Sequence, residues 1–573
     1  MITELAGIAA IFLGAVLLAL PLGRYIARVY KSEPTWMDGF MGPLERLFYR
    51  ASGLNPAEEM NWKQQLYALL GINLVWFVLC FLILLNQGWL PLNPDGNPSM
   101  TPDLAFNTGI SFLVNCNLQH YSGETGLSYL SQMAGIMFLQ FVTAGTGMAA
   151  CATVFNAMQE RQADRIGNFY VYFLKSCTRV LLPVSLVAAL VLAYSGTPMN
   201  WEGKAEIVTL EGDTVHVSRG PAAAMVAIKQ AGTNGGGYFG VNSAHPLENP
   251  TYLTNMVENL LILLIPMALV FALGYYLNRR RLAWMIFGIM TLGFVLLLTP
   301  TVVQEWQGNE ALAELGLSAE SGSLEGKEMR LGVAASAMWG ISTTVTSNGS
   351  VNAMHDSFTP LSGAMMMLGM MINAFYGGVG VGFLNFYVFI ILAVFIAGLM
   401  VGRTPEFLGK KIEAREVKIA AVVAILHPTL ILAGTALSSY LAANDTPMGW
   451  WFGGTAQGWL NNPSFHGFSE MLYEYTSSAA NNGSGFEGLA DNNPFWNITT
   501  GIVLLLSRYL PIIGPVAIAG LLAQKSYTQA GAGTLRVDSM TFGLVVFAVI
   551  AIVAALSFFP ALALGPLAEY FSF

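Results

Sequence analysis

Four short polar segments interrupt an otherwise apolar chain, and their residue types suit a backbone that binds a cation without charged ligands. They read Val114-Asn115-Cys116-Asn117, Thr233-Asn234-Gly235-Gly236, Thr346-Ser347-Asn348-Gly349 and Ala480-Asn481-Asn482-Gly483. Glycine and asparagine adopt left-handed backbone conformations more readily than other residues, which lets consecutive carbonyl oxygens point to one side. Rings of such oxygens replace the water shell of K⁺ in selectivity filters. The four segments together predict a K⁺ filter.

The four segments keep one register along the chain. Aligned on Asn117, Gly235, Gly349 and Gly483, they lie 118, 114 and 134 residues apart. One such segment alone is more often an ordinary turn between helices, but four in register favour a repeated pore loop. The first segment departs from the others because it has no glycine. Asn117 can adopt the left-handed backbone there, but its side chain and that of Gln119 add bulk.

Each filter segment needs an element that holds it at membrane depth. A short helical stretch precedes each one, over 103–114, 221–232, 331–345 and 469–479. The negative C-terminal ends of such helices would point at the filter and favour a cation there. Irregular backbone within a membrane is tolerated only where it is buried in protein or lines a wet cavity. These stretches therefore predict re-entrant pore helices between pairs of membrane spans.

The composition independently places the chain in a membrane. Of its 573 residues, 54% are hydrophobic and only 10% are charged, whereas soluble domains carry about 25% charged residues. This excludes a soluble enzyme, and the net charge of -8 gives no basic footprint for nucleic acid. Stretches of about 20 apolar residues cross a bilayer as helices. Ten are present, near 2–23, 66–86, 128–155, 179–195, 252–277, 283–303, 361–400, 419–442, 497–521 and 540–568.

The order of these elements predicts an all-α integral membrane fold with ten transmembrane helices. One leading helix with its loop (1–65) comes first, and one trailing helix (539–573) comes last. Between them lie four repeats of span, pore loop and span, at 66–158, 159–282, 283–418 and 419–538. A period this long indicates a duplicated membrane unit rather than a solenoid, whose repeats are shorter.

The connections between the spans alternate in charge. Twenty of the 26 Lys and Arg residues lie in or next to one set of connections, at 24–65, 156–178, 278–282, 401–418 and 522–539. The positive-inside rule then puts this set in the cytoplasm and both termini in the periplasm of a bacterial inner membrane. Most acidic residues lie on the other side. They either concentrate cations there or are simply left behind by the sorting of the basic residues.

Two features inside the spans suggest control over leak through a pore. Arg508 lies in the middle of an apolar span, where a charge costs roughly 2.5–3.5 kcal/mol to insert. We expect it either to repel cations below the filter or to pair with backbone carbonyls. The 361–400 stretch is too long for one crossing and holds Gly377, Gly378 and Gly380. These glycines should either break the helix into a gate or allow close helix packing.

No catalytic or metal-binding motif accompanies the predicted pore. The cysteines have no metal spacing, and neither an Asp-Lys-Thr-Gly loop nor a nucleotide-binding glycine-rich loop is present. The predicted cytoplasmic loops have at most about 40 residues, too few for a nucleotide-binding domain. We expect no cofactor and no catalytic site, so that any ATP must be hydrolysed by another chain. An intramembrane enzyme would need paired acids or His/Glu clusters within spans, and a non-transporting scaffold would not need four aligned segments.

The filter segments and their surroundings resemble those of a known family. The strings are Asn107-Thr-Gly-Ile-Ser111, Tyr121-Ser-Gly-Glu-Thr125, Thr233-Asn-Gly-Gly-Gly237, Gly240-Val-Asn-Ser-Ala-His-Pro246 and Tyr473-Glu-Tyr-Thr476. They look like the A subunit of the bacterial Kdp potassium-transporting P-type ATPase, and the resemblance covers essentially the whole chain.

This resemblance implies a fold of the superfamily of K⁺ transporters. It also implies a subunit that takes K⁺ from the periplasm at high affinity and passes it to a P-type ATPase subunit (B), with a single-span C subunit and a small F subunit as further partners. The alternative is a stand-alone Trk/Ktr-type K⁺ transporter or channel, which shares the four-repeat plan. The two extra helices and the quoted strings favour the Kdp family.

Overall fold

Long apolar helices form the body of the protein. A computed structural model describes residues 2–308, 316, 322–402, 404–451, 453–529 and 536–572. Within this part, ten helices are long and apolar enough to cross a membrane, which confirms the predicted all-α membrane fold. They are α1 (Ile2–Tyr30), α3 (Trp62–Asn86), η1 with α6 (Ser131–Met137, Phe138–Gln159), α7 with η2 and α8 (Phe169–Ser176, Cys177–Leu181, Leu182–Tyr194), α10 (Tyr252–Tyr276), α11 (Arg280–Gln307), α15 (Val381–Val401), α16 (Ala414–Ala443), α18 (Pro494–Gln524) and α19 (Met540–Leu564).

Four shorter helices lie between pairs of spans, where the sequence predicts pore helices. They are α4 (Pro102–Leu113), α9 (Ala222–Ala231), α13 (Val333–Val345) and α17 (Ser464–Ala480), and most of their residues are buried. Each packs against the spans of its own repeat, as α17 does against α16 and α18. The leading helix α1 packs along α10, and the trailing helix α19 packs against α11 and α15. The pore helices are therefore held inside a shell of spans.

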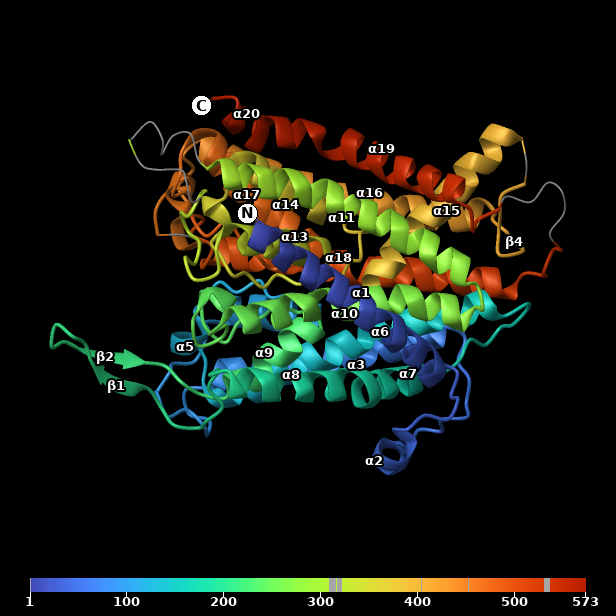
Figure 1. Cartoon of the computed structure of the whole chain (residues 1–573), viewed down its shortest axis with the longest axis horizontal. Helices are drawn as coiled ribbons and strands as arrows, with labels where there is room; N and C mark the ends of the chain where they lie inside the picture. Colours follow the sequence, from blue (N-terminus) through green and yellow to red (C-terminus); the bar gives the residue numbers. More distant parts are fainter. Residues whose placement is uncertain are drawn as a thin grey trace.

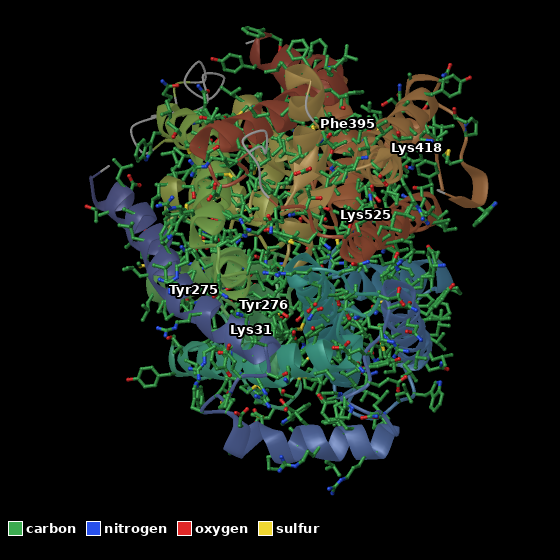
Figure 2. All side chains as sticks on the ribbon, turned by 90° about the vertical axis from the view of Figure 1, so that its right-hand side faces the viewer. Lys31, Tyr275, Tyr276, Phe395, Lys418 and Lys525 are labelled. Atoms are coloured by element: carbon green, nitrogen blue, oxygen red, sulfur yellow. The ribbon has the colours of Figure 1, made fainter. Side chains whose placement is uncertain are left out.

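The two ends of the bundle differ in what they carry. The spans lie roughly side by side, and both chain termini lie at one end, together with the antiparallel hairpin of β1 (Ala205–Val208) and β2 (Thr214–Val217) (Figure 1). The opposite end, which we call the basic end, holds the connections rich in Lys and Arg. Figure 2 looks onto it and labels Lys31, Lys418 and Lys525. The predicted alternation of charge thus corresponds to two separate faces, although Arg403 lies outside the described residues.

The remaining elements are short. At the basic end lie α2 (Asp38–Ser52) and the antiparallel pair of β3 (Glu406–Phe407) and β4 (Lys410–Lys411). Near the other end lie α5, η3, η4, η5, η6 and α20 (Gly123–Gly126, Asn242–Ala244, His355–Ser357, Gly449–Trp451, Ala456–Trp459 and Pro566–Tyr570). One apolar core runs through most of the spans, and a second surrounds α4.

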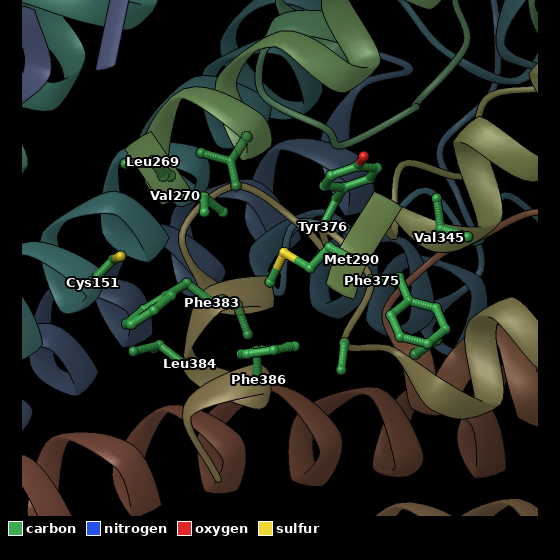
Figure 3. Close-up of a cluster of buried hydrophobic side chains, with 14 of the residues drawn as sticks. Cys151, Leu269, Val270, Met290, Val345, Phe375, Tyr376, Phe383, Leu384 and Phe386 are labelled. Carbon is green, nitrogen blue, oxygen red and sulfur yellow. The ribbon is translucent and has the colours of Figure 1, made fainter. Parts of the chain in front are cut away.

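The seventh apolar stretch is broken into two helices, as its glycines predict. Helix α14 (Pro360–Ile372) ends at one side of the break, and α15 begins at Val381 on the other. Gly377 and Gly380 have φ of +62° and +84°, a conformation that suits glycine and does not continue a right-handed helix. Figure 3 shows Phe375 and Tyr376 of the break packed among apolar side chains. The interruption is therefore a fixed part of the core.

The fourth span begins earlier than predicted. Its first helix starts at Phe169 rather than near 179, so that Lys175 lies inside a helix instead of a loop. The helix accommodates its two basic residues because each has partners. Lys175 Nζ donates to Ser32 Oγ at 2.8 Å, and Arg179 Nη2 forms an ion pair of 2.6 Å with Glu45. Hydropathy alone does not reveal these partners, because they lie on distant segments.

Candidate ion-binding site

The predicted filter segments follow directly on the C-terminal ends of the four pore helices, and all four make the same backbone turn. In each, a backbone N–H donates at 2.9–3.0 Å to the carbonyl five residues earlier. The donor and acceptor pairs are Cys116 and Ser111, Asn234 and Lys229, Asn348 and Thr343, and Asn482 and Ser477. The sixteen predicted filter residues are buried apart from Gly483, which is partly exposed. Four different sequences therefore end their pore helices in one way.

The left-handed positions repeat with the spacing of the sequence alignment. The residue directly before the donor of each turn has φ between +47° and +58°, at Asn115, Thr233, Ser347 and Asn481. Two residues further on, φ is +82°, +87° and +109° at Gly235, Gly349 and Gly483. Asn117, at the equivalent position of the first loop, does not have a positive φ. An L-residue pays about 1–2 kcal/mol for that conformation, and the first loop adopts it at Asn115 alone.

The four loops touch one another in a closed ring. A Cβ atom added to each glycine would overlap the next loop, 2.0 Å from the Asn348 carbonyl oxygen at Gly235, 2.1 Å from the Asn482 carbonyl oxygen at Gly349 and 2.6 Å from the Asn117 nitrogen at Gly483. The fourth junction is a hydrogen bond of 2.8 Å from Asn117 Nδ2 to the Gly235 carbonyl. Segments more than 100 residues apart in the chain therefore meet around one centre.

The side chain of Asn117 reaches into this centre. Besides the bond to Gly235, its Nδ2 donates to the Gly349 carbonyl at 3.3 Å. Its Oδ1 would lie 1.8 Å from a Cβ at Gly349, and within the described part of the chain it is buried without a hydrogen-bond partner. The first loop thus contributes a side-chain oxygen where the other three loops bring backbone close together. An unsatisfied buried oxygen of this kind is suited to a cation.

Side-chain amides tie the second, third and fourth loops to the preceding repeat, the second through Asn234 Nδ2, which donates to the Cys116 carbonyl at 3.2 Å. Asn348 Nδ2 donates to the Lys229 carbonyl at 3.2 Å, and Asn482 Nδ2 donates to the Thr343 carbonyl at 2.8 Å. These acceptors occupy equivalent positions in successive pore helices. Cys116 stands in the place of these asparagines in the first loop, and a thiol has no amide to make the same tie. The ring is therefore only approximately fourfold.

A buried ion pair that the sequence analysis missed supports the second loop. Lys229 Nζ contacts a carboxylate oxygen of Glu248 and donates to Asn242 Oδ1 at 2.6 Å and to Ser243 Oγ at 2.7 Å. The amide of Asn242 then donates to the Gly235 carbonyl at 2.8 Å. Both charged side chains are fully buried. The available signal was a single charged residue, Lys229, in the otherwise uncharged stretch 221–232.

The break between α14 and α15 lies directly against the loops of the second and third repeats. The Val379 N–H donates to Thr233 Oγ1 at 2.8 Å, and Ser347 Oγ lies 2.8 Å from Asn373 Oδ1. A Cβ at Gly378 would lie 3.6 Å from Ser347 Cβ, which is ordinary van der Waals contact. The predicted gating glycines are therefore next to the predicted filter.

Arg508 lies beside the same break. A Cβ at Gly147 would lie 2.4 Å from the Val379 carbonyl oxygen and 3.4 Å from Arg508 Nη2. Arg508 is only 4% exposed, and its Nη2 has no hydrogen-bond partner among the described residues. This arrangement favours a positive charge held beside the break over a guanidinium whose donors are all paired with carbonyls.

A small, mostly apolar cavity with a few polar residues in its lining adjoins the break. Its volume is about 50 Å³, enough for a few water molecules. Its polar lining comes from Asn373, Asn385, His427 and Ser507, and its apolar lining comes mainly from α15, α16 and α19. A dehydrated ion leaving the loops would thus find polar groups on this side of the break.

Two groups of histidine and acidic side chains lie away from the basic end, in α17 and in the segments packed against it. Their possible ligand atoms lie within 4.8 Å of one another, in His120 with Glu474 and Asp491, and in Asp356 with His466 and Glu470. Both nitrogens of His466 are occupied, at 2.9 Å from Asp356 and 2.8 Å from Glu569. Burial opposes the charge of His466, but these two carboxylates outweigh it and raise its pKa to about 10. His466 therefore serves as a cation that ties α20 to the loops rather than as a metal ligand.

Comparison with known proteins covers nearly the whole chain. The family model of the potassium-transporting ATPase A subunit, KdpA, matches residues 9–571. The potassium-transporting ATPase potassium-binding subunit of Flavobacterium psychrophilum is 69% identical over 570 residues, which is 100% of this chain and 99% of that protein. The subunits of the same name from Bacteroides fragilis and Alicyclobacillus acidocaldarius are 61% and 47% identical, with at least 99% of every chain covered.

Among solved structures, the potassium transporter TrkH from Vibrio parahaemolyticus aligns with a TM-score of 0.48 and 13% identity, over 88% of this chain and 97% of that one. The match to the family model and the identity to its curated members each extend over essentially the full length. The chain therefore belongs to the family of potassium-transporting ATPase A subunits.

Proposed function

We propose that this chain is the K⁺-selective binding and translocating subunit of an ATP-driven, high-affinity potassium importer. K⁺ enters from the periplasm, exchanges its water for oxygens of the four loops and passes on toward a P-type ATPase partner. The filter residues are Val114 to Asn117, Thr233 to Gly236, Thr346 to Gly349 and Ala480 to Gly483. Arg508 and the glycines Gly377, Gly378 and Gly380 limit leak below them.

One observation carries this proposal: four loops from four repeats meet in a closed ring with equivalent backbone turns. The contacts at Gly235, Gly349 and Gly483 leave no space for larger residues. Backbone packed this closely offers carbonyl oxygens to an ion, and such rings discriminate K⁺ from Na⁺. The pore helices end at these loops and add the negative ends of their dipoles.

The energy source and the partners are part of the same proposal. Relatives are named as subunits of a potassium-transporting ATPase, and we assign ATP hydrolysis to the P-type subunit (B), with the single-span C subunit and the small F subunit completing the complex. The basic end faces the cytoplasm by the positive-inside rule. Both termini then lie in the periplasm of a bacterial inner membrane.

Uptake by reconstituted vesicles tests this function. With the ATPase partner present, we expect K⁺ uptake that requires ATP, stops with vanadate and exceeds Na⁺ uptake. Vesicles that contain this chain alone should show no K⁺ uptake that depends on ATP. Equal K⁺ uptake by the chain alone would instead assign it to the stand-alone Trk/Ktr type.

Replacing Arg508 by glutamine should open a K⁺ leak that does not depend on ATP. A unit charge roughly 8 Å from an ion raises the ion's energy by about 2 kcal/mol at an effective dielectric constant of 20, so its loss should increase leak about 30-fold. Efflux of labelled Rb⁺ from vesicles without ATP measures this leak. Arg508→Lys keeps the charge and should leak no more Rb⁺ than the wild type. Equal leak in the wild type and the glutamine variant would refute the role of Arg508 as a barrier.

Replacing Gly378 by leucine should slow transport about tenfold at saturating K⁺, an increase of about 1.4 kcal/mol in the barrier, without changing the preference for K⁺ over Na⁺. The backbone at this position is not left-handed, and a Cβ would have ordinary contacts, so the added bulk enters the region below the loops without forcing them apart. Gly378→Ala is the matched control and should transport almost normally. A leucine variant that transports K⁺ as fast as the wild type would show that the ion does not pass Gly378.

A further inference from the structure

Helix α2 lies outside the bundle at the basic end and runs across the direction of the spans. Figure 1 shows it end-on while the spans lie lengthwise, and Figure 2 shows it lengthwise while the spans point at the viewer. The spans cross the membrane, so the axis of α2 lies nearly parallel to the membrane plane. It follows the end of α1 after a connection of seven residues, 31–37, which holds it close to the membrane surface.

One edge of α2 is fixed to the protein by charge. Glu45 is 4% exposed, and its carboxylate accepts hydrogen bonds from Arg179 Nη2 at 2.6 Å and from Thr178 Oγ1 at 2.8 Å. Asp38 contacts the same guanidinium. Met41, on the same edge, is buried as well. The orientation of the helix about its own axis is therefore fixed, and its other faces point in defined directions.

A second face of α2 is apolar and exposed. Its side chains recur at the i, i+4, i+7 and i+8 positions of an amphipathic helix. They are Phe40, Leu44, Leu47 and Phe48, exposed by 78%, 39%, 63% and 51%. Trp36, just before the helix, is also exposed. The fourth span, against which α2 packs, likewise exposes Leu186 and Leu190. The apolar face thus adjoins a surface of the kind that faces lipid.

A third face of α2 is basic. Arg46 and Arg50 are four residues apart, so that they lie one above the other on the helix, and both are exposed. At 3.6 residues per turn, the anchored, apolar and basic faces lie roughly 120° apart. Arginine binds phosphate oxygens in a bidentate manner. A helix parallel to the membrane, with apolar side chains on one face and arginines on another, has the pattern of an interfacial helix.

We infer that α2 binds anionic phospholipid headgroups at the basic end of the protein. The apolar face enters the boundary between headgroups and acyl chains, and Arg46 and Arg50 hold the phosphates. Glu45 and Asp38 keep the helix in this orientation through Arg179. Lipid fits this surface better than a protein partner does, because the helix lies in the membrane plane beside a span with exposed leucines. The inference does not depend on which ion the protein transports.

Spin labels on α2 in the reconstituted ATPase complex test where each face lies. We would label Leu44→Cys and Arg50→Cys separately in vesicles of phosphatidylcholine with phosphatidylglycerol, since the four natural cysteines are buried. The label at 44 should collide with oxygen but not with a water-soluble nickel chelate, whereas the label at 50 should collide with the nickel chelate. Collisions of the label at 44 with both reagents indicate water, and collisions with neither indicate a covering protein. Either result overturns the inference.

A local quenching experiment tests the preference for anionic lipid. A fluorophore at Leu47→Cys is quenched by brominated phosphatidylglycerol and, separately, by brominated phosphatidylcholine at the same mole fraction. The ratio of quenching by phosphatidylglycerol to quenching by phosphatidylcholine should exceed one. It should fall about fivefold for each arginine lost in Arg46→Gln/Arg50→Gln. The control Arg415→Gln/Lys418→Gln removes two exposed charges at the same end and should leave the ratio unchanged. An unchanged ratio in the α2 variant would show that its arginines do not select headgroups, against the inference.

Discussion

Replacing Gly349 by alanine should raise the K⁺ concentration for half-maximal uptake about a hundredfold, equivalent to about 2.7 kcal/mol, and abolish the preference over Na⁺. The backbone at Gly349 has φ of +87°, and a Cβ there would lie 1.8 Å from Asn117 Oδ1 and 2.1 Å from the Asn482 carbonyl oxygen. Both the first and the fourth loop would have to move, which changes the spacing of the oxygens around the ion. Initial rates of K⁺, Rb⁺ and Na⁺ uptake by the reconstituted complex measure the effect.

A neighbouring glycine provides the control for this experiment. A Cβ at Gly485 would come no closer than 3.9 Å to another residue, and its backbone is not left-handed. Gly485→Ala should therefore stay within about twofold of the wild type, which is under 0.5 kcal/mol. Melting temperature and size-exclusion profile identify any variant that fails to fold. A folded Gly349→Ala protein with normal affinity and selectivity would rule out ion binding at the ring.

Replacing Lys229 by methionine should destabilise the protein by about 3–5 kcal/mol, because it leaves Glu248 buried without its counter-charge. Both side chains are fully buried, and Asn242 connects the pair to the Gly235 carbonyl. We therefore expect a lower melting temperature together with weaker K⁺ binding. Unfolding of the purified complex and the K⁺ dependence of its ATPase activity measure the two effects.

Removing both charges separates stability from ion binding. The variant Lys229→Met/Glu248→Gln has no buried unpaired charge and should recover most of the lost melting temperature. Asn242 would still lack its lysine partner, so K⁺ affinity should recover less than stability. Equal melting temperatures of the wild type and the single variant would mean that the pair does not stabilise this region.

The fold was largely predictable because each span carries its own signal. About 20 apolar residues identify a transmembrane helix without knowledge of its neighbours. The alternating charge of the connections then checks the number and order of the spans. The break before Val381 was also predictable, because clustered glycines weaken a helix locally. The start of the fourth span was not, since Lys175 and Arg179 lie in the helix only through partners on residues 32–45.

The site shows the same division between local and distant causes. The register of the four loops follows from Gly and Asn spacing, and the left-handed residues repeat with that spacing. The conformation of Asn117 and the role of Lys229 depend instead on contacts across more than a dozen residues or between repeats. The sequence alone does not reveal such contacts. A buried amide or charge can pair with several polar groups, and only the packing of the repeats decides which of them it meets.

The hydrogen bond from the Val379 N–H to the Thr233 hydroxyl joins the start of α15 to a loop of the ring. Any tilt or slide of α15 must stretch or break this hydrogen bond. While the bond holds, such a movement would also displace the loop that carries Thr233. In the proposed transport path, ion binding at the ring and opening of the path beneath it would therefore be coupled through this bond. A partner that pushes on α15 from the membrane would loosen the bound ion and clear its exit in a single movement.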